Sequence, residues 1–482
     1  MIKKGLFLFA AIMCLAFVPV SCEEPLPVNP DEEQGNNEEE HPKVETPVKL
    51  QKVKCTVEAV GDNIFDQKPE FTLQLKNPNE VAVKVQVKVT LKTDKGSTVE
   101  TVTDSVEVAA LGTNDYIYTP TENLVPGFYT ARCAVNGITA KDAAFGISPF
   151  EIISAPDMQD DFNEYWENAK AQLPELKEGE TVSLQEIKST DSYKIYKVEI
   201  HSVPNEIDGD PVVIRGFYVE PQDGKKHPVL MHFFGWDDRR GSVRVPSGAN
   251  GEYTEFYLSN RGQYHNNRAA AYEMVDTWIA EHGEWQATDP CKYASILDPN
   301  DEYNWFGFNF GIKDGFYYRG AFLDCVQAVR FMATREASDM DNLFAEGSSQ
   351  GGAYSYAAAA LSDYQFTAIA PCVAFLGDYP DYFELAGWPG NVAKANQGSM
   401  TDEEMYAFLS YFDTKNLATR ISCAVIACSN LKDGTCPPHT NTAPYNNLNT
   451  QDKEMHYYPD LEHVEPADWA KKYNNFFKAR MK

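Results

Sequence analysis

One segment of this 482-residue sequence restricts the fold more than any other, because it joins an apolar stretch, a G-x-S-x-G motif and an alanine-rich run. The three parts cover residues 343–346, 347–351 and 353–361. A sharp strand-to-helix turn holds the central serine of such a motif in a strained conformation, at a helix end that favours developing negative charge. We predict that Ser349 is a nucleophile, with Ser348 at the variable position. The alternative is a turn that merely requires small residues.

A nucleophilic serine needs a general base, and three histidines follow Ser349: His439, His456 and His463. In folds that carry this motif the base comes last, on a loop after a strand. His463 follows a strand-like run and precedes a predicted terminal helix at 466–481, so it is the predicted base. His439 follows two prolines in a predicted loop and is the alternative. His456 lies inside the strand-like run.

The base in turn needs a carboxylate that orients its ring. Asp433 follows the apolar run at 424–432 and precedes His463, which fits the chain order serine, acid, histidine. The alternative role of Asp433 is that of a turn residue beside Gly434. Asp460 is the next candidate for the acid, because it lies just before His463.

Strand-like and helix-like patterns alternate over residues 151–482. Apolar strand-like runs cover residues 194–200, 212–219, 229–234, 343–346 and 423–428. Apolar residues have helical spacing at 161–173 and at 320–334, where they mark one buried helix face. This alternation predicts a mostly parallel α/β sheet flanked by helices.

Residues 47–150 have a different pattern, in which apolar and polar residues alternate over short runs. The runs cover residues 53–57, 71–75, 83–91, 98–108 and 129–135. Alternation with period two indicates strands with one buried face, and spaced strands of this kind predict an immunoglobulin-like β-sandwich. Cys55 and Cys133 lie in an early and a late strand. They form either a disulfide, which export would allow, or two buried thiols.

Residues 1–22 have the features of an export signal. Lys3 and Lys4 precede an apolar run at 6–18 that is too short to span a bilayer, and small residues then precede Cys22. This ending resembles the lipobox of bacterial lipoproteins, in which the cysteine is acylated. An ordinary cleaved signal peptide with an incidental cysteine is the alternative. An acylated Cys22 would anchor the chain at the outer membrane, on its periplasmic side or at the cell surface.

Residues 23–46 hold nine acidic residues, four prolines and no aromatic residue. Such a stretch cannot bury enough apolar surface to order itself, so we expect a solvated tether rather than a specific ligand site. The whole chain carries 71 Asp and Glu against 42 Lys and Arg, a net charge of −29, which disfavours nucleic acid as a partner. The cysteines form no C-x-x-C pair, and we expect no metal site.

Several segments of the second region resemble those of a known enzyme family. They are residues 161–166, 261–263, 317–319, 347–351, 410–413 and 433–438. On these segments, residues 155–482 resemble the acetyl xylan esterases and cephalosporin-C deacetylases of carbohydrate esterase family seven, which are α/β-hydrolases. The resemblance supports Ser349, Asp433 and His463 as a catalytic triad. It also implies two main-chain N–H donors for the oxyanion, at Gln350 and at Trp236, where relatives usually carry tyrosine.

Three features depart from the family pattern. Val464 follows His463 where relatives carry glutamate, so Glu462 or Glu465 would have to take over any role of that glutamate in the loop. Residues 264–305 are longer than in relatives and are expected to reshape the mouth of the site. Relatives are commonly ring-shaped hexamers, and the added sandwich and insertion weaken the expectation of the same homo-oligomer here.

An aromatic cluster lies at 305–310, with Phe316, Tyr317 and Tyr318 shortly after it. Aromatic faces suit the apolar faces of sugars, so the cluster could stack a carbohydrate. Such clusters more often belong to a core or a subunit interface.

Together these features predict a serine esterase that removes acetyl groups from acetylated xylan or xylo-oligosaccharides through an acyl-enzyme, without a metal or organic cofactor. Another acyl esterase or a peptidase is an alternative, because the same serine turn serves both chemistries. A catalytically inactive glycan-binding lipoprotein is a second alternative, which the departure at Val464 leaves open. The expected partners are an acetylated carbohydrate and, through the lipid anchor only, a membrane.

Overall fold

The computed structural model describes residues 50–57, 62–139, 142–204, 212–236, 246, 248, 251–262 and 306–482. The predicted export signal with Cys22, the acidic tether and the insertion at 264–305 therefore lie outside the described residues. Within the described ranges, no helix is long and apolar enough to cross a membrane.

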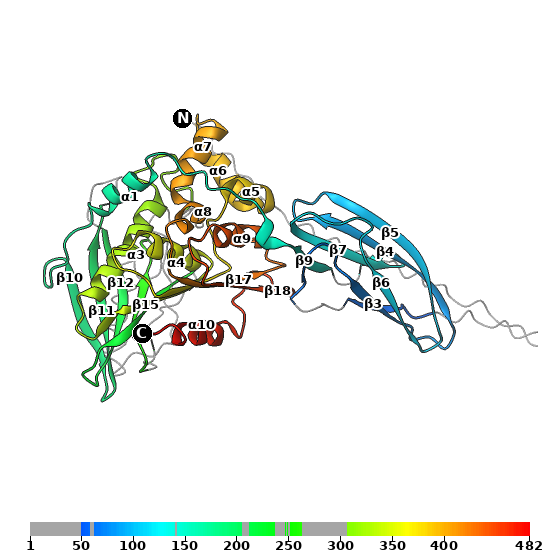
Figure 1. Cartoon of the computed structure of the whole chain (residues 1–482), viewed down its shortest axis with the longest axis horizontal. Helices are drawn as coiled ribbons and strands as arrows, with labels where there is room; N and C mark the ends of the chain where they lie inside the picture. The colour runs from blue at the N-terminus through cyan, green and yellow to red at the C-terminus, as the bar shows by residue number, and fades with distance from the viewer. Residues whose placement is uncertain are drawn as a thin grey trace, which may run out of the picture. The chain divides into compact units, whose positions relative to one another are not determined.

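The first region consists of two β-sheets (Figure 1). One has the strand order β1 (Lys54–Val57), β3 (Phe71–Lys76) and β6 (Thr113–Tyr118). The other has the order β2 (Ile64–Phe65), β9 (Ala143–Ile147), β7 (Gly127–Val135), β4 (Val83–Thr93) and β5 (Thr98–Val108), with β8 (Ile138–Thr139) paired to β7. The five runs with alternating residues are thus strands, and β2, β6, β8 and β9 are additional to them.

A single hydrophobic cluster joins the two sheets. It includes Leu73 and Leu75 from β3 together with Val87 and Val89 from β4, all of them buried. These are the alternate residues of each strand, so the period-two pattern marks the side chains between the sheets. Such a pair of sheets with a shared core is the arrangement that a β-sandwich requires, whereas its immunoglobulin-like topology stays a prediction.

Cys55 and Cys133 are both free thiols. Of the two alternatives, the structure therefore contains the pair of thiols and not the disulfide. Cys55 lies on β1 and Cys133 on β7, in different sheets. Cys133 is buried beside apolar neighbours, and burial raises the pKa of its thiol to about 12. Cys133 is therefore a protonated core residue at neutral pH.

The second region is built on a nine-stranded sheet. Its strand order is β10 (Val182–Ser189), β11 (Tyr193–Ser202), β12 (Val212–Pro221), β14 (Thr254–Ser259), β13 (His227–Phe233), β15 (Ser338–Ser348), β16 (Ala368–Cys372), β17 (Ala424–Asn430) and β18 (Lys453–Tyr458). The pairs from β10 to β14 are antiparallel, and every pair from β14 to β18 is parallel. The carboxyl ends of the parallel strands share one edge, where sites of α/β sheets form.

Helices cover both faces of this sheet (Figure 1). They are α1 (Phe162–Lys170), α3 (Tyr317–Ala333), α4 (Gln350–Leu361), α5 (Tyr379–Leu385), α6 (Gly387–Asn396), α7 (Asp402–Leu409), α8 (Thr414–Ala418), α9 (Pro438–Asn446) and α10 (Trp469–Lys478), with 3-10 turns at Pro149–Glu151 and Ser410–Phe412. Along β15 the buried side chains alternate between the two sides. Leu343 belongs to the core beneath α3 and α4, and Phe344 stacks on Phe477 of α10 with ring centroids 4.7 Å apart.

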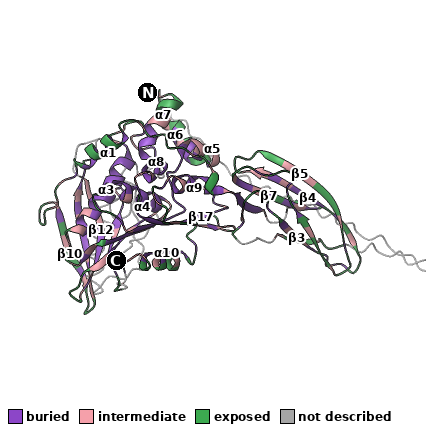
Figure 2. Ribbon diagram, in the orientation of Figure 1, coloured by how far each residue is buried: buried purple, intermediate pink, exposed green. Residues whose placement is uncertain are grey.

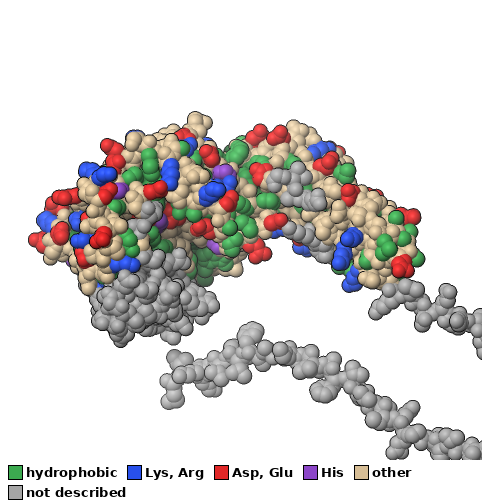
Figure 3. Space-filling view, turned by 90° about the horizontal axis from the view of Figure 1, so that it is seen from below, with side chains coloured by type: hydrophobic (Ala, Val, Ile, Leu, Met, Phe, Trp, Pro, Cys, Tyr) green, Lys and Arg blue, Asp and Glu red, His purple; other side chains and the backbone are tan. Residues whose placement is uncertain are grey.

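Helix α3 differs from the prediction of a single buried face, because nearly all of its side chains are buried (Figure 2). It packs against β11 and β14 of the sheet and also against α1 and α4. Most of its buried side chains are apolar, and Arg319, Asp324 and Gln327 are buried polar residues among them. The surface beyond this core mixes acidic, basic and apolar side chains on the face seen in Figure 3.

Candidate active site

Ser349 lies at the sharp turn between β15 and α4. Its φ of 59° and ψ of −120° are outside the regions that side-chain-bearing residues normally occupy. A residue held in this way costs on the order of 1–3 kcal/mol, which the surrounding structure has to supply. The strand before it and the helix after it fix the turn, so the prediction of a strained serine at this position is confirmed.

The two glycines of the motif permit close backbone contacts. A β-carbon at Gly347 would lie 2.4 Å from the carbonyl oxygen of Gly351, and a β-carbon at Gly351 would lie 2.1 Å from the carbonyl oxygen of Phe233. Both distances are far inside van der Waals contact. The G-x-S-x-G spacing therefore lets α4 begin directly against the ends of β13 and β15.

The three predicted triad residues come together at the carboxyl ends of the parallel strands. Nε2 of His463 lies 2.9 Å from Oγ of Ser349, and Nδ1 of His463 lies 2.7 Å from Oδ2 of Asp433. Asp433 follows β17, and His463 follows β18. The arrangement can move a proton from the serine hydroxyl to the imidazole while the carboxylate orients the ring.

Main-chain donors hold the Asp433 carboxylate in place. Its Oδ1 accepts hydrogen bonds from the N–H groups of Thr435 and Cys436, each at 2.8 Å, and its side chain is fully buried. Oδ2 is left to face His463. Asp460, the next candidate for the acid, instead pairs with Lys432 at 2.8 Å on the surface.

The two predicted oxyanion donors belong to segments that adjoin the nucleophile. Gln350 is the first residue of α4, so its main-chain N–H lies at the amino end of the helix. Trp236 follows Gly235, where a β-carbon would lie 3.8 Å from that of Ser349. The loop after β13 therefore runs beside the nucleophile, as the donor role of Trp236 requires.

Two further contacts hold the loop that carries His463. The side-chain amide of Asn430 donates to the carbonyl oxygens of Glu462 at 2.6 Å and of Val464 at 2.7 Å. Oγ of Ser348 donates to Oε2 of Glu465 at 2.7 Å. Sequence reasoning missed Asn430, and its position at the end of β17 is the signal that could have found it.

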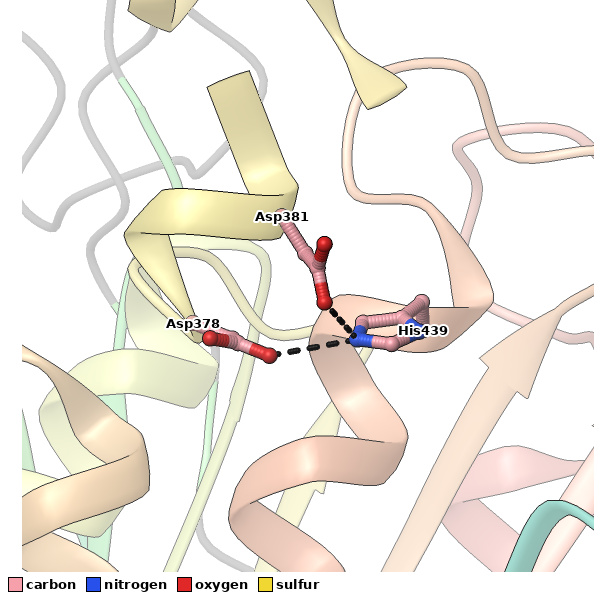
Figure 4. Close-up of side chains that lie close together, drawn as sticks. All are labelled: Asp378, Asp381 and His439. Atoms are coloured by element: carbon pink, nitrogen blue, oxygen red, sulfur yellow. Dashed lines mark hydrogen bonds and ion pairs between the residues drawn. The ribbon is translucent and has the colours of Figure 1, made fainter. Parts of the chain in front are cut away.

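His439 does not belong to the triad. The sequence predicted that it lies in a loop, and this prediction is wrong. It lies in α9, and its Nε2 contacts Oδ2 of Asp378 at 3.1 Å and Oδ2 of Asp381 at 2.9 Å (Figure 4). Burial alone would lower its pKa, but the hydrogen bonds with these two carboxylates raise the pKa to about 9. The ring is therefore a buried cation at neutral pH.

Asp378, Asp381 and His439 are also the group among the described residues whose ligand atoms lie close enough to hold a metal ion, within 4.8 Å of one another. However, Asp381 already pairs with Lys95, and Asp378 pairs with Lys415 at 3.0 Å. A protonated imidazole offers no lone pair to a metal. The arrangement is therefore that of an ion-pair network.

The aromatic cluster that could have stacked a sugar belongs largely to the core. Phe306, Phe310, Phe316, Tyr317 and Tyr318 are all buried, and their rings pack on one another. Trp305 lies outside the described residues. These five side chains therefore belong to the hydrophobic core and do not form an exposed surface for a sugar.

Arg261, from the predicted family segment at 261–263, has a structural role. Its guanidinium donates two hydrogen bonds of 2.7 Å to the carboxylate of Asp324 in α3. A β-carbon at Gly320 would lie 2.0 Å from the guanidinium, so the glycine leaves room for it. This buried bidentate pair ties the end of β14 to α3.

A pocket of about 310 Å³ adjoins the serine turn. It is lined by His232, Phe233, Phe234, Gly235, Pro246, Tyr257, Glu346, Ser348 and Glu465. His232 contacts Glu346 at 2.6 Å and Glu255 at 3.3 Å. Burial opposes the charge on its ring, yet these two carboxylates raise the pKa of His232 to about 9. The pocket therefore carries fixed charges beside the nucleophile.

Comparison with known proteins finds relatives over the region that contains Ser349, Asp433 and His463. Residues 151–481 match the family described as acetyl xylan esterase (AXE1). The acetyl esterase Axe7A of Xylanibacter ruminicola is 27% identical over 347 residues, which cover 70% of this chain and 71% of that protein.

Two solved structures are similar to this chain. The acetyl xylan esterase from Paenibacillus sp. R4 superposes with a TM-score of 0.54 at 25% identity, covering 69% of this chain and 98% of that one. Acetyl xylan esterase 1 from Thermoanaerobacterium sp. JW/SL YS485 gives a TM-score of 0.53 at 23% identity, with the same coverage of 69% and 98%. The predicted α/β-hydrolase fold of the second region is thereby confirmed.

Proposed function

Because the chain belongs to the acetyl xylan esterase family and is a carboxylic ester hydrolase, we propose that it removes acetyl groups from acetylated xylan or xylo-oligosaccharides. The observation that carries the proposal is the hydrogen-bonded series from Ser349 through His463 to Asp433. All three residues lie inside the range that matches the family.

In the first half of the reaction, Oγ of Ser349 attacks the acetyl carbonyl carbon while Nε2 of His463 accepts its proton. The carbonyl oxygen becomes an oxyanion, which the main-chain N–H groups of Gln350 and Trp236 stabilise. A preorganised donor of this kind typically contributes about 3–4 kcal/mol to the transition state. The tetrahedral intermediate collapses when His463 protonates the departing sugar oxygen, and the acetyl group stays on Ser349.

In the second half, water attacks the acetyl-serine and His463 accepts its proton. The second tetrahedral intermediate collapses to acetate, and the proton returns to Oγ of Ser349. Asp433 stabilises the imidazolium that forms in both halves. One oxygen of its buried carboxylate accepts two main-chain hydrogen bonds and the other contacts Nδ1 of His463. The ring of His463 therefore keeps one orientation throughout the reaction.

Acetate release from acetylated xylan and from acetylated xylo-oligosaccharides tests the proposal, with Ser349→Ala as the control. We expect release by the wild type and a loss of about 10⁶-fold in the variant, on the scale of other triad knockouts. A fluorophosphonate probe should label the wild type stoichiometrically at Ser349. Labelling at another serine would contradict the assignment, and an unlabelled protein would favour the alternative of an inactive lipoprotein.

A comparison of substrate classes separates the esterase from a peptidase with the same serine turn. We expect turnover of p-nitrophenyl acetate and its short-chain homologues and none of peptide p-nitroanilides. Faster cleavage of the amides than of the esters would favour the peptidase.

A further inference from the structure

Trp388 is an exposed aromatic residue whose ring packs against Phe375 and Trp236. It lies in the first turn of α6, and 36% of its surface is exposed. One face of its ring stacks on Phe375, with centroids 5.3 Å apart and planes 28° apart. The ring is therefore fixed from one side.

Phe375 connects this ring to the catalytic serine. Its main-chain N–H donates to the carbonyl oxygen of Ser349 at 3.0 Å, and its side chain is buried. Its ring also packs against Phe306 and Tyr382, at centroid distances of 6.0 Å and 5.7 Å. Phe375 is thus held by its neighbours, and its main-chain hydrogen bond links it directly to the serine turn.

Trp236 stands at a steep angle to both rings. Its plane makes 79° with Trp388 at 5.9 Å and 75° with Phe375 at 6.2 Å. Gly235, the residue before it, approaches the side chain of Ser349. Two tryptophan rings therefore meet at nearly a right angle, and one of them follows the glycine that approaches Ser349. We call this pair the Trp236–Trp388 corner.

We propose that the Trp236–Trp388 corner binds a pyranose unit of the substrate, with Trp388 against the face of the sugar ring. The proposal rests on the proposed deacetylation of a carbohydrate. A xylopyranose ring carries no exocyclic hydroxymethyl group, so its axial C–H bonds can face an indole ring closely. Aromatic residues with one covered face lose little side-chain entropy on binding, which suits a shallow sugar subsite.

Two substrates distinguish this subsite from a structural role of Trp388. Acetylated xylotriose engages the corner through its sugar rings, whereas p-nitrophenyl acetate presents the same ester without a sugar. In Trp388→Ala we expect the ratio of kcat/KM for acetylated xylotriose to kcat/KM for p-nitrophenyl acetate to fall about tenfold, mainly through KM. Trp388→Tyr keeps an aromatic face and should restore most of the ratio.

Tyr364→Ala is the matched control, because Tyr364 is 37% exposed and follows the far end of α4. We expect its ratio to equal that of the wild type. An equal ratio in Trp388→Ala would overturn the subsite. So would a change of mass in light scattering that accompanies Trp388→Ala, because Trp388 would then be a contact between subunits.

Calorimetry with unacetylated xylotriose separates the subsite from the reaction. We expect xylotriose to bind Ser349→Ala, and to bind the double variant with Trp388→Ala about tenfold more weakly. A wild type that cleaves p-nitrophenyl acetate but releases no acetate from any glycan would overturn the proposed function. Equal binding by the two variants would overturn the subsite alone.

Discussion

Ser348 donates a hydrogen bond of 2.7 Å to Glu465, so the residue before the nucleophile is tied to the loop that carries the base. The two residues are far apart in sequence, and they flank in sequence the pair Ser349 and His463, whose side chains are also in contact. The family resemblance of the sequence implies a glutamate directly after the histidine, where this chain has Val464. Glu465 thus supplies a carboxylate to this loop two residues after His463. Glu462 and Glu465 are both exposed, and Glu465 is the one whose carboxylate accepts the hydrogen bond of Ser348.

Glu465→Ala should lower kcat about tenfold and change KM little, because the His463 loop loses one of its anchors while Asn430 retains the other. Steady-state kinetics with p-nitrophenyl acetate measures both constants. Glu465→Gln keeps an oxygen acceptor and should recover most of the activity. Glu462→Ala is the matched control. If it lowers kcat as much as Glu465→Ala does, the contact between Ser348 and Glu465 has no specific role.

Asp433→Asn should reduce kcat by about 10³- to 10⁴-fold, because an amide at this position favours the wrong tautomer of His463. Ser349 should still react slowly with a fluorophosphonate, which the rate of labelling measures. Asp460→Asn alters a surface pair with Lys432 and should keep nearly the wild-type rate. A wild-type kcat in Asp433→Asn would mean that the orienting acid lies elsewhere.

The fold and the three central residues could be predicted from local patterns. The strand, motif and helix around Ser349 are contiguous in sequence, and the chain order of such folds narrows the choice of acid and base. The sequence offers Glu465 only as one of two candidates with Glu462, and the position of Asn430 at the end of β17 marks that residue without saying what it binds. Their roles depend on where the His463 loop closes against β17 and the serine turn, which no local pattern records.

His439 shows how a local rule can mislead. The two prolines before it suggested a loop, yet α9 begins at Pro438. Proline is well tolerated in the first turn of a helix, because the N–H that it lacks would have no intrahelical acceptor there. The aromatic residues near Phe306 posed a different problem, since composition alone does not tell a core ring from an exposed one such as Trp388.

Acylation of Cys22 stays a proposal that a fractionation experiment can decide. If the cysteine carries lipid, the protein should enter the detergent phase, and Cys22→Ala should move it to the aqueous phase. Mass spectrometry of the mature N-terminus measures the modification directly. An unmodified N-terminus in the wild type would refute the lipid anchor and leave an ordinary signal peptide.

The His439 network should make stability depend on pH in the alkaline range. Folding raises the pKa of His439 from 6.5 to about 9, so the folded protein binds this proton more tightly than the unfolded chain. The resulting stabilisation is fully present below pH 6.5 and is lost as the pH rises through about 9. A shift of this size corresponds to roughly 3 kcal/mol.

Urea unfolding of the wild type and of His439→Gln, measured from pH 6 to 10, isolates this contribution from that of other groups such as His232. We expect the variant to be less stable at pH 6–7, because Asp378 and Asp381 lose the cation between them. The difference in free energy of unfolding between the two proteins should shrink above pH 8, as the wild-type ring loses its proton. A difference that stays constant with pH would mean that His439 stabilises the fold through packing and neutral hydrogen bonds rather than through its charge.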